Sequence, residues 1–590
     1  MSTQLTWHGP GTRTRNQTIN LCVGALPQRA RAADFSILPA LRRLAGFCSS
    51  LVGDGFTTTT TQSDFDAIVV GAGFAGLYML HRLRSAGLRA RVLEAASGPG
   101  GTWFWNRYPG ARCDIESMQY SYQFSKALEQ EWDWTERYAA QPEILKYVDH
   151  VIERFNLRED IQFNTRVKSA LYDERSARWT VTTETGETLN AQFCIMASGC
   201  LSSTNLPEFK GRDSFKGDAY HTGQWPHAEV DFTGKRVAII GTGSSSVQAI
   251  PLIAAQATHL TVFQRTPNYS IPAFNGPLTE DDRARIKANY ATLREVGKQQ
   301  ILGYDIQFND KLAANATPEE IRAECERRWR LGGLYFYGAF ADMLISDEVN
   351  RTVADFVREK IREKVSDPVL ADLLAPKSVF GCKRICADTH YFETFNRANV
   401  TLVDVSQTPI SEITANGVKV GEHEYAVDAI VFATGFDAMT GSLNRIDIRG
   451  KGGQKLRDKW AAGPRTYLGL CCAGFPNLFT ISGPGSPSVL TCMITSIEQH
   501  VEFIGDCIDY MRKTGQRQIE PTVEAEAAWV SHVNDVAAGT LFNSCNSWYL
   551  GANVPGKQRI FMPYVGFPPY VQKCNEVVAS GYAGFSLSAA

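Results

Sequence analysis

Residues 66–76 read DAIVVGAGFAG, and this stretch decides the fold. A mostly apolar run predicts a buried strand, and Gly71, Gly73 and Gly76 follow it with the spacing G-x-G-x-x-G. In such a motif the first glycine permits a tight turn, the second lets backbone N–H groups approach a pyrophosphate, and the third lets helix and strand pack closely. A helical pattern continues over residues 77–86. The stretch therefore predicts a dinucleotide-binding βαβ unit.

Glu94 stands at the end of the next predicted strand, which covers residues 89–93. It follows Gly71 by 23 positions. A carboxylate at this place accepts hydrogen bonds from a ribose that carries no phosphate. We therefore expect the first unit to bind a dinucleotide of that kind.

A second unit of the same type begins at residues 236–246, RVAIIGTGSSS, and residues 260–263 form its next predicted strand. Ser246 occupies the place of the third glycine, where a small side chain weakens the motif without abolishing the cradle of N–H groups. The residues expected to form this cradle are Gly241, Thr242, Gly243, Ser244, Ser245 and Ser246.

Gln264 is the counterpart of Glu94 in the second unit, because it follows Gly241 by 23 positions, and Arg265 comes next. No carboxylate is left here to repel a 2′-phosphate, and a guanidinium can hold one through two parallel hydrogen bonds. An ordinary surface arginine after a strand is the alternative interpretation. The pattern favours NADP over NAD for the second unit.

Length and charge restrict the class of protein. A chain of 590 residues is too long for one hydrophobic core and indicates two or three domains. The formal net charge of −2 and the pI of about 6.6 give no reason to expect a nucleic-acid partner or an anionic membrane surface. Chemistry on small molecules is the better expectation.

The 14 cysteines show no disulfide-like framework. Cys113, Cys194 and Cys507 lie in or beside apolar or motif segments, which is typical of reduced thiols. We therefore expect a reducing, cytoplasmic compartment.

Two segments bear on membranes and targeting. No residue between Thr466 and Ile497 is charged, but prolines, glycines and serines interrupt the stretch, so it predicts a buried loop region and no integral membrane segment. Residues 1–33 contain four arginines and no acidic residue, which resembles a transit peptide. We expect residues 1–63 to be a disordered N-terminal extension, with organelle targeting or an upstream start codon as alternatives.

The order of predicted elements indicates an α/β fold with two Rossmann-like dinucleotide-binding domains. Residues 64–207 and 428–590 are expected to form the first domain, which is discontinuous, and residues 208–427 the second. Charged helical patterns at about residues 279–374 predict a helical insertion in the second domain.

Two further motifs are specific to one enzyme family. Residues 215–226 read FKGDAYHTGQWP, and residues 100–114 read GGTWFWNRYPGARCD. They match the shorter and the longer fingerprint of Baeyer–Villiger monooxygenases, which are class B flavoprotein monooxygenases. From Asp66 to about Gly566 the chain resembles the cyclohexanone and phenylacetone monooxygenase type, including the pair Lys383-Arg384. Residues 1–63 lie outside this resemblance.

The resemblance implies that the first domain holds FAD and that the second binds NADPH, which reduces the flavin. In this family reduced flavin reacts with O₂ to give a C4a-peroxyflavin. The peroxide attacks a ketone, and the adduct rearranges to an ester or lactone. A ketone and O₂ are therefore the expected substrates.

The family motifs also imply roles for individual residues. Arg384 maps to the catalytic arginine, and Asp114 to the carboxylate beside the flavin that orients it. A peroxyanion and then an oxyanion need a fixed positive charge, which arginine keeps even in a dry site. Lys383 would reach the 2′-phosphate of NADP beside Arg265 and Thr266. The other cofactor contacts implied are Gly71, Gly73, Gly76, Glu94, Thr102, Trp103, Tyr120, Val167 and Met493 for FAD, and Gln248 and Trp548, with residues 241–246, for NADP.

Three further features could belong to the site. Residues 488–490 would line the substrate pocket beside the flavin. His221 titrates near neutral pH, but its place between the domains favours a structural or conformational role over proton transfer. Cys382, Cys386 and His390 have a spacing that suggests a metal ion, yet they lack a fourth ligand and bracket two cations, so no metal site is predicted.

Three alternative functions share parts of this pattern. A flavin monooxygenase that oxidises nitrogen or sulfur has the same two folds, although Asp114 and the pair Lys383-Arg384 favour ketones. A disulfide reductase needs a C-x₄-C motif after the first unit, and Cys113 has no such partner. A non-catalytic FAD/NADP-binding sensor is favoured only by Ser246. The particular ketone and the oligomeric state stay open.

Overall fold

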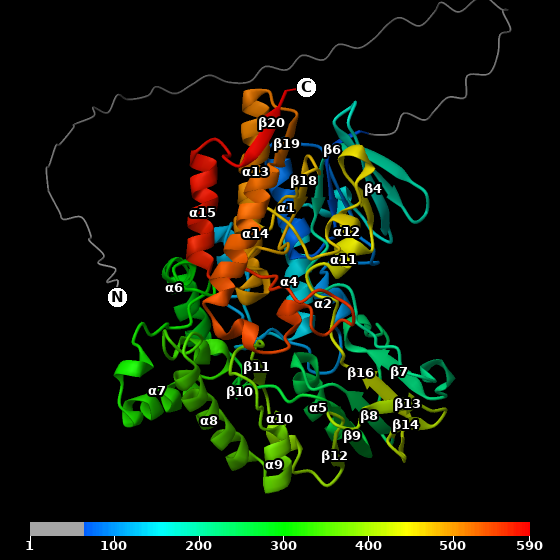
Figure 1. The fold of residues 1–590 in the computed structure, drawn as a ribbon, viewed down its shortest axis with the longest axis vertical. Coiled ribbons are helices and arrows are strands. Elements are labelled where there is room, and N and C mark those ends of the chain that lie inside the picture. The colour runs from blue at the N-terminus through cyan, green and yellow to red at the C-terminus, as the bar shows by residue number, and fades with distance from the viewer. Residues whose placement is uncertain (1–63, 590) are drawn as a thin grey trace, which may run out of the picture. The chain divides into compact units, whose positions relative to one another are not determined.

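The computed structural model describes residues 64–589. The extension expected at residues 1–63 lies outside the described residues. Two sheets with parallel strands organise the described part, and Figure 1 shows their strands in separate regions of the ribbon. Both expected βαβ units are present, one in each sheet.

The first sheet has a parallel centre around β1 (Phe65–Val70). On one side β1 pairs with β2 (Ala90–Leu93), and on the other with β6 (Thr188–Met196). The remaining strands are β3 (Ile161–Gln162), β4 (Val167–Asp173), β5 (Arg178–Thr183), β17 (Asp447–Arg449) and β18 (Leu478–Thr480). Because β17 pairs with β4 and β18 with β6, the C-terminal part of the chain completes this sheet.

The glycine turn after β1 leads directly into α1 (Phe74–Ser85). Gly71 has a φ of +107°, and a Cβ there would lie 2.6 Å from the carbonyl oxygen of Ala197. A Cβ on Gly76 would lie 1.8 Å from the carbonyl oxygen of Gly71. Both positions require glycine, as the motif predicts, because any side chain would push α1 away from the sheet.

The C-terminal helix α13 (Met493–Thr514) packs along α1. Arg82 of α1 forms ion pairs at 3.0 Å with both Asp506 and Asp509 of α13. Residues from opposite ends of the described chain therefore share one layer over the first sheet.

The second sheet contains five parallel strands. Their order is β12 (Val400–Asp404), β9 (His259–Gln264), β8 (Arg236–Ile240), β16 (Ala429–Phe432) and β7 (Asp218–His221). The domain boundary expected at residue 428 is misplaced, because β16 is buried throughout and pairs with β8 and β7 of this sheet. The chain returns to the first sheet only after β16.

Four helices occupy the stretch expected to be a helical insertion: α6 (Glu280–Lys298), α7 (Pro318–Leu331), α8 (Asp347–Lys364) and α9 (Pro368–Leu374). Thr279 and Thr317 close capping boxes at the starts of α6 and α7, so both helices begin where their sequences indicate. Figure 1 shows α7, α8 and α9 together, apart from β4 and β6 of the first sheet.

The remaining helices and strands complete the described part of the chain. They are α2 (Thr102–Trp105), α3 (Lys126–Glu131), α4 (Gln141–Arg154), α5 (Ser244–Gln256), α10 (Tyr391–Thr394), α11 (Gly441–Asn444), α12 (Leu456–Lys459), α14 (Val523–Ala538), α15 (Phe567–Ala579), β10 (Ser270–Pro272), β11 (Cys386–Asp388), β13 (Ile410–Ile413), β14 (Gly417–Val420), β15 (His423–Ala426), β19 (Gln518–Pro521) and β20 (Phe585–Ser588).

The uncharged stretch from Thr466 to Ile497 is almost entirely buried and consists mostly of loop around β18, which confirms the expectation of a buried loop region. Within residues 64–589, no helix combines the length and the apolar character needed to cross a membrane.

Candidate active site

A cavity of about 1500 Å³ lies at the carboxyl ends of the central strands of both sheets. Val70 and Leu93 end strands of the first sheet, Ile240 and Phe263 lie at the ends of strands in the second, and all four line the cavity. Ligands of open α/β sheets bind at this edge. A pocket for one small ligand measures roughly 300–1,000 Å³, so this cavity has room for more than one.

Two helix N-termini open into the cavity. Gly73 precedes α1 and Gly243 precedes α5, and neither helix start has a side-chain cap. Both glycines line the cavity, together with Ser244 and Ser245 of the first turn of α5. Uncapped N–H groups and the positive end of the helix dipole favour a pyrophosphate at each start.

The two glycine turns have nearly the same geometry. Gly241 has a φ of +111°, and a Cβ there would lie 2.5 Å from the carbonyl oxygen of Ala433. In the first unit, a Cβ on Gly71 would lie 2.6 Å from the carbonyl oxygen of Ala197. Gly76 and Ser246, which were expected among the cofactor contacts, do not line the cavity. Ser246 is completely buried, and its hydroxyl has no hydrogen-bond partner in residues 64–589. Both residues therefore contribute to helix packing.

Glu94 lines the cavity at the end of β2. Its two carboxylate oxygens accept hydrogen bonds from the backbone N–H groups of Ala72, at 2.6 Å, and Ala96, at 2.8 Å. Burial raises the pKa of this carboxyl group, although the two N–H groups oppose the shift. The backbone thus holds Glu94 at the place where the ribose of a dinucleotide is expected.

The other residues expected to contact FAD come from three elements and a loop. Thr102 and Trp103 begin α2, Val167 begins β4, Met493 begins α13, and Tyr120 lies in a loop. All five line the cavity. The indole N–H of Trp103 donates a hydrogen bond of 3.2 Å to the hydroxyl of Tyr120. The structure therefore brings together residues that the sequence separates widely.

Gln248 of α5 links the two units. Its side-chain oxygen accepts a hydrogen bond of 2.7 Å from the Tyr108 hydroxyl, and its amide nitrogen donates to the carbonyl oxygen of Arg112 at 3.0 Å. Both partners belong to the motif at residues 100–114. Gln248 also lines the cavity, and its side-chain amide connects α5 to the motif at residues 100–114.

Arg265 and Lys383 form a cationic wall of the cavity next to Thr266. Burial lowers the pKa of the Lys383 ammonium group, and the positive charge of Arg265 lowers it further. An anion between them would relieve this repulsion. Gln264, by contrast, is buried and donates a hydrogen bond of 2.8 Å to the carbonyl oxygen of Leu373, at the end of α9.

Arg384 and Asp114 form a bidentate ion pair on the wall of the same cavity. Nε and Nη2 of Arg384 donate to the two carboxylate oxygens at 2.6 and 2.9 Å, and Nη1 donates to the carbonyl oxygen of Val489 at 3.0 Å. Burial alone would lower the pKa of the guanidinium group. The charge and hydrogen bonds of Asp114 outweigh burial and hold this pKa well above its ordinary value.

Two residues that the sequence analysis did not identify support the backbone of Arg384. The Tyr337 hydroxyl donates to the carbonyl oxygen of Lys383 at 3.4 Å and accepts from the N–H of Ile385 at 3.0 Å. The side chain of Asn268 donates to the carbonyl oxygen of Arg384 at 3.3 Å. Neither residue belongs to a recognisable motif, so only the folded arrangement reveals them.

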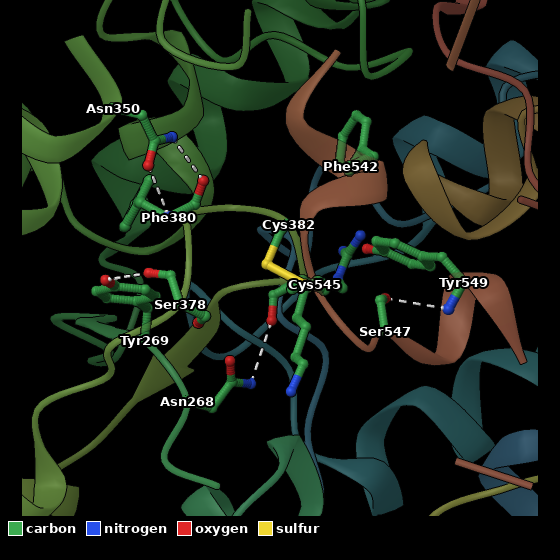
Figure 2. The surroundings of a disulfide bond; sticks show 12 residues. Asn268, Tyr269, Asn350, Ser378, Phe380, Cys382, Phe542, Cys545, Ser547 and Tyr549 are labelled. Atoms are coloured by element: carbon green, nitrogen blue, oxygen red, sulfur yellow. Dashed lines mark hydrogen bonds between the residues drawn. A yellow bond between two sulfur atoms is a disulfide. The ribbon is translucent and has the colours of Figure 1, made fainter. Parts of the chain in front are cut away.

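Cys382, which directly precedes Lys383 and Arg384, forms a disulfide with Cys545, and Figure 2 shows this bond. The expectation of reduced cysteines without a disulfide framework is wrong for this pair, because the fold brings two cysteines 163 residues apart to a Cα–Cα distance of 6.2 Å. The other ten cysteines of residues 64–589 are unpaired and buried, including Cys113, Cys194 and Cys507 as expected.

The structure also places residues 488–490, His221 and the cysteines Cys382 and Cys386. Val489 lines the cavity, whereas Ser488 and Leu490 do not. His221 is buried at the end of β7, where its Nδ1 accepts from the N–H of Gly223 at 3.0 Å. Burial lowers its pKa, so the ring is neutral near pH 7. Cys386 accepts a hydrogen bond from the side chain of Asn268, and Cys382 is bonded to sulfur, so the disulfide removes Cys382 from a metal-binding trio.

Comparisons with known proteins agree with this geometry. A family model described as pyridine nucleotide-disulphide oxidoreductase matches residues 68–309. A Baeyer-Villiger monooxygenase of Pseudooceanicola batsensis is 44% identical over 531 residues, which cover 89% of this chain and 96% of that protein. The solved structure of an oxidised steroid monooxygenase bound to NADP has a TM-score of 0.86 and 52% identity, and the match covers 90% of this chain and 100% of that one.

A third relative carries a different reaction in its name. The phenazine N-monooxygenase PhzNO1 of Lysobacter antibioticus is 41% identical over 531 residues, which cover 89% of this chain and 97% of that protein. Identity at this level extends over both nucleotide units and includes the region of the Arg384–Asp114 pair. The chain belongs to the Baeyer–Villiger monooxygenase family.

Proposed function

We propose that this chain inserts one oxygen atom of O₂ next to the carbonyl group of a ketone and so forms an ester or lactone, with FAD and NADPH as cofactors. The reaction converts ketone, O₂, NADPH and a proton into ester, NADP⁺ and water. The observation that carries the proposal is the Arg384 guanidinium, held by Asp114 on the wall of a cavity shared by two nucleotide folds.

The first unit fits FAD. The start of α1 offers uncapped N–H groups for the pyrophosphate, and Glu94 is fixed beside it for the ribose. When bound there, FAD would supply a hydride acceptor for NADPH and, once reduced, the means of activating O₂ for transfer to the ketone. Trp103, Tyr120 and Met493 would contact FAD along the cavity.

The second unit fits NADPH. The start of α5 would bind its pyrophosphate, while Arg265, Thr266 and Lys383 surround the place for its 2′-phosphate. Trp548 lines the cavity and would contact the nicotinamide half.

Arg384 would supply the fixed charge at the reacting centre. A guanidinium has five N–H donors. Three hydrogen bonds to Asp114 and Val489 occupy part of this set, which leaves donors for the ketone oxygen as negative charge develops on it. Arginine keeps its proton throughout, so it acts by electrostatic stabilisation and orientation.

The test is product analysis with ¹⁸O₂, NADPH and a panel of small cyclic, large cyclic, aryl and linear ketones. We expect an ester or lactone that carries one ¹⁸O atom. Arg384→Ala should still allow NADPH to reduce the flavin but should form no ester. The control Arg322→Ala removes an exposed arginine whose partner is Glu359, and it should behave as the unaltered protein. Ester formation by Arg384→Ala at the unaltered rate would refute the assignment.

Oxidation of nitrogen is a second candidate, because the phenazine N-monooxygenase relative covers the same part of the chain. The same assay with aromatic nitrogen heterocycles separates the two. An N-oxide as product, with no ester from any ketone, would favour this alternative.

A further inference from the structure

The disulfide Cys382–Cys545 joins two segments that both reach the cavity. Cys382 directly precedes Lys383 and Arg384, and Cys545 lies three residues before Trp548. Lys383, Arg384, Cys545 and Trp548 all line the cavity. One covalent bond therefore connects the segment that carries the proposed catalytic charge with the loop that carries the proposed nicotinamide contact.

The Cys382 side of the bond is held firmly without it. The Tyr337 hydroxyl bonds to the backbone on both sides of Arg384, and Asn268 bonds to the carbonyl oxygen of Arg384 itself. The N–H of Cys386 donates to the carbonyl oxygen of Tyr269 at 2.9 Å. Loss of the disulfide would leave these contacts, and the ion pair with Asp114, in place.

The Cys545 side has fewer anchors. Two backbone hydrogen bonds attach the ends of residues 541–550 to other segments: the N–H of Leu541 donates to the carbonyl oxygen of Leu344 at 2.8 Å, and the carbonyl oxygen of Tyr549 accepts from the N–H of Met562 at 3.0 Å. Between these ends, the hydrogen bonds of residues 542–548 stay within residues 540–552. Examples are the N–H of Ser547, which donates to the carbonyl oxygen of Cys545, and the N–H of Tyr549, which donates to the hydroxyl of Ser547. Phe542, Trp548 and the buried Tyr549 add apolar packing. Within the described chain, the disulfide is thus the covalent attachment of this loop to the Arg384 segment.

The two cysteine residues also differ in access to the cavity. Cys382 is completely buried, whereas Cys545 is half-buried and lines the cavity. A small thiol entering the cavity can therefore attack the sulfur of Cys545, with Cys382 leaving as a thiolate beside two cationic residues. A second thiol then attacks the mixed disulfide. In sum, the protein disulfide and two thiols give two cysteine thiols and one small disulfide.

We propose that Cys382–Cys545 is a redox-controlled latch that holds the loop of residues 541–550, with Trp548, on the cavity wall. Reduction by a low-molecular-weight thiol releases the loop and weakens retention of NADP(H), while Arg384 keeps its position. Exchange with the corresponding small disulfide restores the latch. The expected effect on NADP(H) binding rests on the proposed function, whereas the Cys382–Cys545 disulfide and the release of the loop do not.

Peptide mapping tests the bond. Digestion of the non-reduced protein should yield one species that joins the peptides of Cys382 and Cys545, and dithiothreitol should separate them. Two separate peptides in protein handled without thiol and with free cysteines alkylated would overturn the proposal. The peptide masses also distinguish cysteines outside residues 64–589 from Cys382 and Cys545.

Hydrogen exchange tests the release of the loop without any need for turnover. In the unaltered protein, dithiothreitol should speed exchange in residues 541–552 but not in residues 381–388. Cys545→Ser should show the fast exchange with or without dithiothreitol. The control Cys325→Ala, which removes an unpaired buried cysteine of α7, should respond as the unaltered protein does. Unchanged exchange after verified reduction would contradict the latch.

Titration with NADP⁺ tests the consequence for the cofactor. Reduction, or Cys545→Ser, should raise the Kd by about three- to tenfold, because the loop must then be ordered on binding. In turnover the KM for NADPH should rise similarly, with kcat within about twofold. An unchanged Kd after verified reduction would refute the cofactor effect. Absence of ester from every ketone would instead refute the proposed function, and the exchange measurement would still decide the latch.

Discussion

Asp114 precedes Arg384 by 270 residues, yet both of its carboxylate oxygens accept hydrogen bonds from the Arg384 guanidinium. The pair fixes the direction of the remaining N–H donors as well as the charge. A displacement of about 1 Å at a reacting centre can cost roughly 100-fold in rate.

Asp114→Ala should therefore lower the rate of ester formation by about 100-fold, because the guanidinium loses its orienting partner. The KM for NADPH should stay within about twofold, since the substitution leaves the phosphate contacts in place. Steady-state kinetics with a ketone that the unaltered protein accepts provide the measurement. Asp506→Ala, which removes a surface partner of Arg82, serves as the control. Equal rates for both variants would exclude the orienting role.

Lys383 should make NADPH affinity depend on pH. Its pKa in the free protein is lowered from the ordinary value of 10.5 by burial and by Arg265, and a bound 2′-phosphate favours the charged form. Affinity should thus be highest below the lowered pKa and should fall as pH rises through it, before pH 10.5 is reached. Titrations of NADPH against pH should show this fall, and Lys383→Arg should flatten it.

NADH is the matched ligand control for Lys383, because it lacks the 2′-phosphate. Its affinity should show no such fall with pH. Lys383→Ala should weaken NADPH binding by about 10- to 100-fold, as expected for a lost charged hydrogen bond, and should leave NADH binding unchanged. A parallel loss for both cofactors would place Lys383 elsewhere than at the phosphate.

Tyr337→Phe removes only the hydroxyl that bonds to the backbone on both sides of Arg384. The rate of ester formation should fall about three- to tenfold, the equivalent of one ordinary hydrogen bond, with the KM for NADPH unchanged. Tyr172→Phe is the control, since its buried hydroxyl has no partner in residues 64–589. If both variants react at the unaltered rate, Tyr337 does not position Arg384.

Ser246→Ala should leave NADPH affinity within about twofold of the unaltered value, because Ser246 does not line the cavity. Its buried hydroxyl has no partner in the described chain, so its removal should raise the free energy of unfolding by up to about 1 kcal/mol. Chemical denaturation and NADPH titration check the two expectations. A tenfold loss of NADPH affinity would instead indicate that Ser246 contributes to the cradle of N–H groups that binds NADPH.

The correspondence between Glu94 and Gln264 shows how far an argument from spacing extends. Glu94 directly follows the second strand of its βαβ unit and Gln264 ends the second strand of the other, close to the place that the count of 23 positions predicts. Glu94 lines the cavity, whereas Gln264 points to the end of α9, and Arg265 takes its place on the wall. Equal spacing in the two units therefore identifies the corresponding residue in the sequence. The residues packed around it decide whether its side chain faces the cavity.

The sequence by itself determined the two nucleotide folds, because each rests on contiguous strand, glycine turn and helix whose physical requirements are local. Family motifs added Asp114 and Arg384. Only the tertiary structure decided that Tyr337 supports Arg384, that β16 belongs to the second sheet, and that Cys382 meets Cys545. Such contacts join residues far apart in the chain, and packing rather than spacing brings them together.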